Sequence, residues 1–214
     1  MTGTGDIIDN YLLWELCKKE GIGEKIVEAS DGEKLEEVVG KVKRKYREKD
    51  YSLEEKMDRV REVSSNPGHK VKMFEYCSWE KETVKVDDLG TTLPHAMSLP
   101  PEVISGSLLD VVEFVREADP EECRSIEYIM GLKQAPEVLN EFLPTVITPG
   151  NIIRRQDRMS KAYGEKNWEI EAVWGAIHDG NHRTVAKILA NDLKEIECYV
   201  GRPSSDKIYE HVKL

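Results

Sequence analysis

The chain has 214 residues and a formal net charge of -10 at pH 7, and 39% of its residues are hydrophobic. This length and apolar content are sufficient to bury a core, as one large domain or two small ones. The negative charge disfavours nucleic-acid binding unless basic residues gather on one face. No apolar run approaches the ~20 residues that span a bilayer, and the N-terminus lacks the basic-then-apolar order of a signal peptide.

The cysteines show none of the close CxxC spacings of zinc sites or redox dithiols. They are Cys17, Cys77, Cys123 and Cys198. We therefore expect a cytoplasmic protein that keeps its thiols reduced and does not associate with a membrane.

The first 65 residues have the spacing of amphipathic helices. Ile7, Tyr11 and Trp14 share one apolar stripe, and Ser52 with Glu55 has the sequence of a capping box. The predicted helical segments span residues 6–20, 24–29, 34–48 and 52–63. Residues 1–65 are thus expected to form a helical N-terminal region.

Residues 66–142 are expected to form a mixed α/β middle region. Val71, Met73 and Tyr76 predict one strand, and residues 83–86 predict a second strand that pairs with it as a hairpin. Asp119 before Pro120 is a favourable helix start. The predicted helices span residues 108–118, 120–130 and 136–142.

Residues 143–214 alternate between short apolar runs and helical patterns. The predicted strands span 145–148, 168–177 and 194–200, and the predicted helices span 151–163 and 184–190. The fold class expected for the whole chain is α+β, with a helical N-terminal part followed by an α/β C-terminal domain.

The stretch from Ile177 to Thr184, IHDGNHRT, carries the strongest functional pattern. An apolar strand runs into Asp179-Gly180, where glycine permits a tight turn with positive φ, and a helix begins within a few residues. The first N–H groups of a helix have no partner within the helix and are backed by its dipole, so they form a ready anion site. His182 and Arg183 add donors, and Thr184 adds a hydroxyl. The alternative is that Asp179 or Asn181 simply caps the helix.

The sequence HDGNHRTVAKILA resembles the D-G-x-H-R-x-x-A signature of the ParB/sulfiredoxin-like superfamily, which includes ParB N-terminal domains, sulfiredoxins and archaeal free-serine kinases. The resemblance implies a ParB/sulfiredoxin-like nucleotide-binding region over residues 143–214. It also implies that phosphates are held by Gly180, Asn181, His182, Arg183 and Thr184. Asp179 and His182 are the implied catalytic residues, and Asp179 could instead organise the turn.

Departures from the superfamily's patterns narrow the function. Sulfiredoxins place a reactive cysteine where this chain has Asn181, so reduction of a sulfinic acid is not expected. The 14 residues after Val200 leave no room for the helix-turn-helix of a partitioning ParB. The kinases use an upstream glutamate as base, and Glu75 and Glu102 are the candidates for that role here.

Two further patterns bear on the same ligand. Arg154, Arg155 and Arg158 crowd one predicted helix and could contact additional phosphates, or they could simply be solvated. A resemblance to the H-P-F-x-D-G-N-G-R motif of Fic adenylyltransferases fails, because His178 abuts Asp179 and His182 replaces the motif's second glycine.

The expected function is a nucleotide-dependent phosphotransferase or nucleotide hydrolase that acts on a small molecule, with ATP or ADP and Mg²⁺ as cofactors. The alternatives are a non-catalytic nucleotide- or nucleic-acid-binding regulator and a ParB-like nuclease. The net charge makes tight, sequence-specific DNA binding unexpected.

Overall fold

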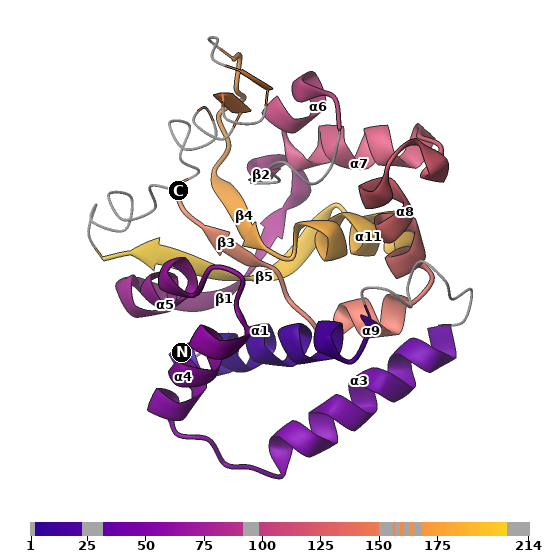
Figure 1. Cartoon of the computed structure of the whole chain (residues 1–214). Helices are drawn as coiled ribbons and strands as arrows, with labels where there is room; N and C mark the ends of the chain where they lie inside the picture. Colours follow the sequence, from indigo (N-terminus) through magenta and orange to yellow (C-terminus); the bar gives the residue numbers. More distant parts are fainter. Residues whose placement is uncertain are drawn as a thin grey trace.

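The computed structural model of the chain describes residues 3–22, 32–91, 99–149, 156, 159–160, 163–164 and 168–204. Within these residues, nine α-helices surround a five-stranded sheet (Figure 1). The N-terminal helices are α1 (Thr4–Lys19), α3 (Gly32–Arg47), α4 (Leu53–Val63) and α5 (Pro67–Tyr76). The later helices are α6 (Pro101–Ser105), α7 (Leu108–Glu117), α8 (Arg124–Lys133), α9 (Pro136–Asn140) and α11 (Asn181–Asn191). The prediction of an α+β chain that begins with helices is confirmed.

The sheet is mixed, with strands in the order β1-β5-β3-β4-β2. The strands are β1 (Cys77–Lys85), β2 (Leu89–Thr91), β3 (Thr145–Ile147), β4 (Gly175–Asp179) and β5 (Glu195–Pro203). β5 pairs antiparallel with β1 and parallel with β3, while β4 pairs antiparallel with β3 and parallel with β2. One sheet therefore joins strands from the regions 66–142 and 143–214.

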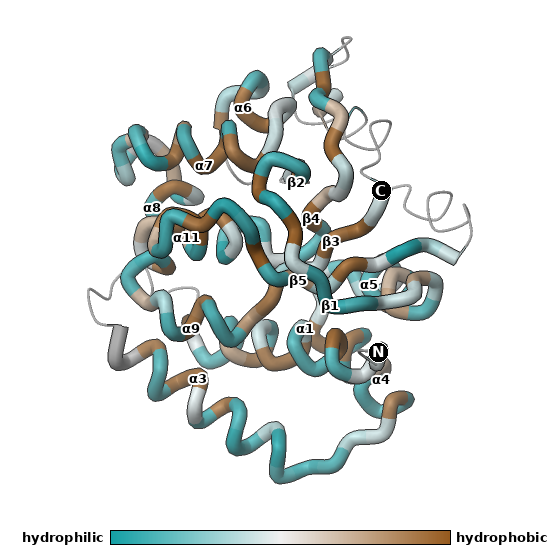
Figure 2. The backbone as a smooth tube through the Cα atoms, turned by 180° about the vertical axis from the view of Figure 1, so that it is seen from behind, coloured by the Kyte–Doolittle hydropathy of each residue, from teal (hydrophilic) through white to brown (hydrophobic). Residues whose placement is uncertain are grey.

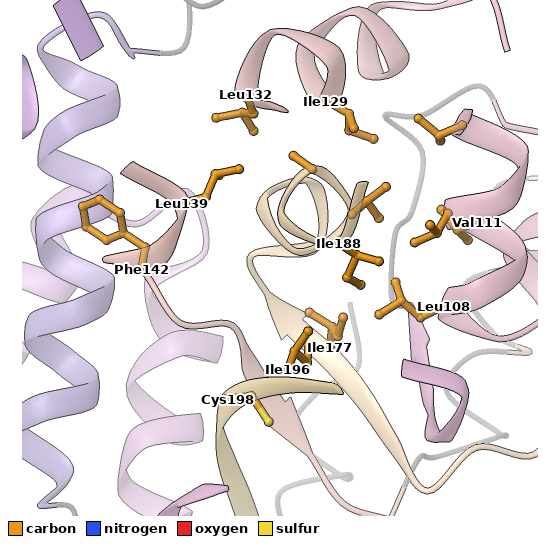
Figure 3. Close-up of a cluster of buried hydrophobic side chains, with 14 of the residues drawn as sticks. Leu108, Val111, Ile129, Leu132, Leu139, Phe142, Ile177, Ile188, Ile196 and Cys198 are labelled. Atoms are coloured by element: carbon orange, nitrogen blue, oxygen red, sulfur yellow. The ribbon is translucent and has the colours of Figure 1, made fainter. Parts of the chain in front are cut away.

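Apolar side chains cover both faces of the sheet. On one face, Ile177 and Ile196 pack beneath Ile188 of α11, which α7, α8 and α9 enclose (Figure 3). On the other face, Trp79 and Ile147 join a second cluster built from α1, α4 and α5. The ends of the strands consequently lie between two sets of helices.

The predicted strand at residues 71–76 is wrong, because this segment forms α5. Asn66 and Pro67 start a helix rather than only ending the preceding one. The Asn66 side chain accepts a hydrogen bond from His69 N, and proline is favourable in the first helical turn. The predicted hairpin is therefore also wrong, since β1 pairs with β5.

Other predicted elements also differ from the structure. The helix expected at 120–130 divides into a short 3₁₀ turn, Pro120–Glu122, and α8, because Cys123 is extended. The strand expected at 168–177 is confined to β4, since Glu171 N donates to Ser105 O instead of to a strand. Helix α6 and strand β2 were not predicted. The helix expected at 24–29 lies outside the described residues, and so does most of the helix expected at 151–163.

A side chain of α1 fixes the chain just before β3. Asn10 is buried, its Nδ2 donates to Leu143 O at 2.9 Å, and its Oδ1 accepts from Leu143 N at 3.0 Å. This pair of hydrogen bonds attaches the N-terminal helix to the central sheet. No helix in the described ranges is long and apolar enough to cross a membrane.

Gly201 illustrates how tightly the sheet and its cover are packed. A Cβ at this position would lie 2.6 Å from Trp79 Cζ3 and 2.7 Å from Ile147 Cδ1. We expect Gly201→Ala to lower the free energy of unfolding by about 1–3 kcal/mol, because overpacking displaces buried neighbours. Denaturant unfolding measures the change.

Gly40 provides the matched control. It lies within α3, and a Cβ there would meet nothing within 4 Å. Gly40→Ala should raise the stability by about 0.5–1 kcal/mol, because alanine favours the helix. Equal effects of the two substitutions would contradict the packing described for β5.

Candidate functional site

The strand, turn, helix and strand predicted around Asp179 and Gly180 are present as β4, a one-residue turn, α11 and β5. Gly180 has φ +87° and is the N-cap residue of α11, where no side chain caps the helix. Thr184 Oγ1 donates to Gly180 O at 2.8 Å. A Cβ at Gly180 would lie 2.9 Å from Arg183 Nη2, so glycine is needed for both conformation and space.

Asp179, the last residue of β4, is held between two cations. Its Oδ1 accepts from Lys70 Nζ and its Oδ2 accepts from Arg183 Nη2, both at 3.0 Å. Burial alone would raise the pKa of this carboxyl, but Lys70 and Arg183 lower it well below its usual value. Asp179 is therefore ionised at neutral pH and joins α5 to the start of α11.

Arg183 is enclosed, with 5% of its side chain exposed. Its guanidinium lies over the Trp14 ring at 4.2 Å from the centroid, and Lys70 Nζ lies 5.0 Å from the Tyr11 centroid. Both aromatic residues belong to α1. Arg183 therefore does more than offer donors at the helix start, since it stacks on the core and pairs with a buried carboxylate.

His182 points away from this ion pair, toward α8. A hydrogen bond of 3.3 Å joins its Nε2 to Ser125 Oγ, and its ring meets Tyr128 edge-on at 5.4 Å. Burial, together with the Arg183 and Lys18 charges, lowers the pKa of His182 to about 4. The imidazole is therefore neutral at physiological pH.

Two buried polar atoms at the start of α11 have no hydrogen-bond partner among the described residues. They are Asn181 Oδ1, an acceptor, and Arg183 Nε, a donor. Unpaired buried polar groups are costly and few in native proteins, and a bound molecule can satisfy them. They accompany helix N–H groups that no side chain caps.

The structure brings Asp179, Gly180, Asn181, His182, Arg183 and Thr184 together at one strand end. It does not bring the two glutamate candidates there. Glu75 lines a hollow between α1, α4 and α5, and Glu102 is exposed at the start of α6. Arg154, Arg155 and Arg158 lie outside the described residues.

The described residues do not fit a Mg²⁺ site of their own. They contain no group of three or more His, Cys, Asp or Glu side chains placed to hold a metal. Both carboxylate oxygens of Asp179 are already paired with cations. Mg²⁺ is commonly held by one or two carboxylates plus substrate phosphates.

The residues that sequence reasoning missed are those contributed by other elements. Lys70 comes from α5, Trp14 and Tyr11 come from α1, and Ser125 and Tyr128 come from α8. Trp14 and Tyr11 have the helical spacing of core residues, which the sequence does show. Nothing in the sequence near Lys70 indicates that it pairs with a carboxylate more than 100 positions away.

Comparisons with protein-family models, with curated proteins and with solved structures yield no match to this chain.

The enclosure of Arg183 predicts that Arg183→Ala destabilises the fold. The substitution leaves a buried carboxylate with one cation and removes the group stacked on Trp14. Loss of one partner of a buried ion pair costs about 3–5 kcal/mol. The stability of Arg183→Lys should lie between those of the wild type and Arg183→Ala, because lysine keeps the charge but cannot stack as a planar group on Trp14.

The control is a second Arg–Asp pair, on the surface. Arg116 pairs with Asp192 at 3.2 Å, with 49% and 76% of the two side chains exposed. Arg116→Ala should change the stability by less than about 1 kcal/mol. Chemical denaturation measures the free energy of unfolding of each variant. Equal losses for Arg183→Ala and Arg116→Ala would refute the structural role of Arg183.

The low pKa of His182 predicts a pH-dependent stability. Between the ordinary histidine value of 6.5 and about 4, the unfolded chain binds a proton at this residue and the folded chain does not. Stability therefore falls as pH decreases through this range, by roughly 3 kcal/mol from His182 alone. His182→Gln should flatten the part of the unfolding curve between pH 6.5 and 5, above the range where carboxylates titrate. Parallel curves for the two proteins would show that His182 does not titrate this way.

Proposed function

We propose that the chain binds the phosphates of a nucleotide at the N-terminus of α11 and uses the bound nucleotide in phosphotransfer or hydrolysis. The observation that carries the proposal is an uncapped helix start beside two buried cations that share one carboxylate. The backbone turn supplies N–H donors, and the side chains supply charge. Nucleotide phosphates require both.

The charges at the site leave a positive surplus. Lys70 and Arg183 contribute two positive charges, Asp179 contributes one negative charge, and His182 is neutral at pH 7. The dipole of α11 adds about half a positive charge at its N-terminus. Side-chain exposures of 12% for Lys70 and 14% for Asp179 leave this field largely unscreened by water.

The resemblance to the ParB/sulfiredoxin-like superfamily supports the same ligand. The residues of the D-G-x-H-R motif gather at the strand end, as a phosphate-binding turn requires. Under this proposal Asn181, His182 and Arg183 offer backbone N–H groups, and Asp179 positions Arg183 and Lys70. Thr184 closes the first turn through Gly180 O.

The proton affinities of the two candidate catalytic groups restrict the mechanism. The pKa of Asp179 is well below its usual value, and that of His182 is about 4. Neither group is a strong base at neutral pH. Phosphoryl transfer relies mainly on positioning and charge stabilisation, so Arg183 and Lys70 would contribute more than a base at these two positions.

The same observation favours a second candidate, a non-catalytic nucleotide-binding regulator. A site with cations and helix N–H groups, but without a strong base, can hold a nucleotide without turning it over. Measurement of nucleotide turnover separates the two functions once binding is established.

Asn181→Asp tests the binding site at the cost of one long hydrogen bond, from Asn181 Nδ2 to Ile177 O at 3.5 Å. A carboxylate at the first position of α11 suits the helix dipole, so the variant should fold, while its charge repels phosphate. Thermal-shift titrations with ATP, ADP, CTP and GTP, with and without Mg²⁺, measure binding, because 100-fold excess over Kd stabilises by about 2.7 kcal/mol. We expect at least one nucleotide to stabilise the wild type and Asn181→Asp to abolish that stabilisation.

Asn191→Asp is the matched control, since it makes the same change at the exposed C-terminal end of α11, about 15 Å away. It should keep nucleotide binding. Stabilisation that survives Asn181→Asp would place the nucleotide elsewhere. Binding without turnover would favour the regulator over the enzyme.

A further inference from the structure

A basic run ends α3 and continues into the turn that follows it. Six cations and a single acidic residue, Glu48, occur between positions 41 and 49, in a chain whose net charge is -10. The cations are Lys41, Lys43, Arg44, Lys45, Arg47 and Lys49. We call them the basic face of α3.

The basic face is turned toward solvent by the packing of the helix. Leu35, Val39, Val42 and Tyr46 are buried on the opposite side of α3, which contacts α1 and α9. Figure 2 shows hydrophilic residues along the C-terminal half of α3, at the edge of the molecule. Apart from Lys43, which is half-buried, the cations are exposed.

Few acidic groups neutralise this face. Lys43 pairs with Glu141 of the α9 end. Across the described part of the chain, Lys41, Arg44, Lys45, Arg47 and Lys49 form no ion pair. Their charge is therefore available to a partner.

Helix stability accounts for only part of the arrangement. The helix dipole favours Arg44, Lys45 and Arg47, which lie in the last turn, but not Lys41 and Lys43. Lys41 and Lys45 are four residues apart, as are Lys43 and Arg47, and like charges at this spacing destabilise a helix by a few tenths of a kcal/mol per pair. Burial and then the Arg47 charge lower the pKa of Lys43, which shows that the cations act on one another.

We propose that the basic face of α3 binds the phosphate backbone of duplex nucleic acid without reading its sequence. Residues four positions apart rise about 6 Å along a helix, so Lys41 and Lys45 are spaced by that rise along α3, as are Lys43 and Arg47. Phosphates on one strand of a duplex are about 3.4 Å apart along its axis, so such a row of cations can meet more than one of them.

An anionic membrane fits this face less well. Helices that bind membrane surfaces insert exposed apolar side chains between the lipids. The large hydrophobic residues exposed in the described ranges are Leu53, Tyr76 and Trp174, and none belongs to α3. Close to the basic face, Arg59 instead stacks on Tyr51 at 4.2 Å and adds a further cation near the end of α3.

The acidity of the whole chain limits the strength of binding and does not prevent it. At 0.15 M ionic strength the Debye length is about 8 Å, so more distant acidic groups are screened. Five phosphate contacts give a salt slope of about -4.5, which weakens binding by about 500-fold between 50 and 200 mM salt. The interaction is expected to be measurable at low salt and strongly salt-dependent.

Fluorescence anisotropy of the full chain with labelled 20-base-pair DNA and RNA duplexes, at 50 and 200 mM salt, tests the proposal. The variant Lys45→Glu with Arg47→Glu should raise Kd at least tenfold and reduce the slope to about -2.7, the value for three contacts. The variant should fold, because each new carboxylate faces a lysine four residues earlier, Lys41 or Lys43. Circular dichroism and Tm verify this.

The matched control is Lys85→Glu with Lys194→Glu, which changes the net charge equally at exposed positions away from α3. It should bind duplex within threefold of wild type, as should Asn181→Asp. An equal loss of duplex affinity in the lysine control would show that net charge, and not the basic face, determines binding. A loss in Asn181→Asp would place the duplex at α11. Absence of binding at 50 mM salt, or tighter binding to phosphatidylserine vesicles than to duplex, would overturn the proposal.

Discussion

The buried carboxylate of Asp179 is the group on which the geometry of the candidate site depends. Removing a charge from water costs several kcal/mol, and only closely placed countercharges repay it. Lys70 and Arg183 do so, each at 3.0 Å, and Arg183 is itself held flat against Trp14. One ion therefore fixes α1, α5, β4 and α11 relative to one another, although these elements are far apart in the sequence.

The same ion pair limits the substitutions and movements that the site tolerates. A side chain at Gly180 would be strained, because its φ is +87° and a Cβ there would lie 2.9 Å from Arg183 Nη2. Arg183 cannot move toward a ligand without leaving Asp179 with one partner. A ligand at this turn must then be bound mainly by helix N–H groups and by the field of fixed charges. That is the preorganised arrangement in which electrostatic stabilisation is most effective.

Local sequence predicted the turn but not its surroundings. The order of strand, Asp179-Gly180 turn, helix and strand follows from an apolar run, a glycine and a helical period, all within a few residues. The apolar spacing of residues 71–76 suits either a strand or a helix, and the helix start signal of Asn66 and Pro67 lies several residues before them. The wrong prediction of a strand there concealed Lys70, whose role depends on a long-range pairing that no local pattern contains.

The two positive regions of this acidic chain differ in how far their charged side chains are exposed to solvent. At α11 the charged side chains of Lys70, Asp179 and Arg183 are at most 14% exposed. On α3 the cations, apart from Lys43, are exposed to solvent. Helix α1 lies between the two regions, since it contacts α3 and supplies Trp14 to Arg183 (Figure 1). The two proposed sites are therefore joined by packed residues of α1, and a difference in nucleotide affinity with and without duplex would reveal coupling between them.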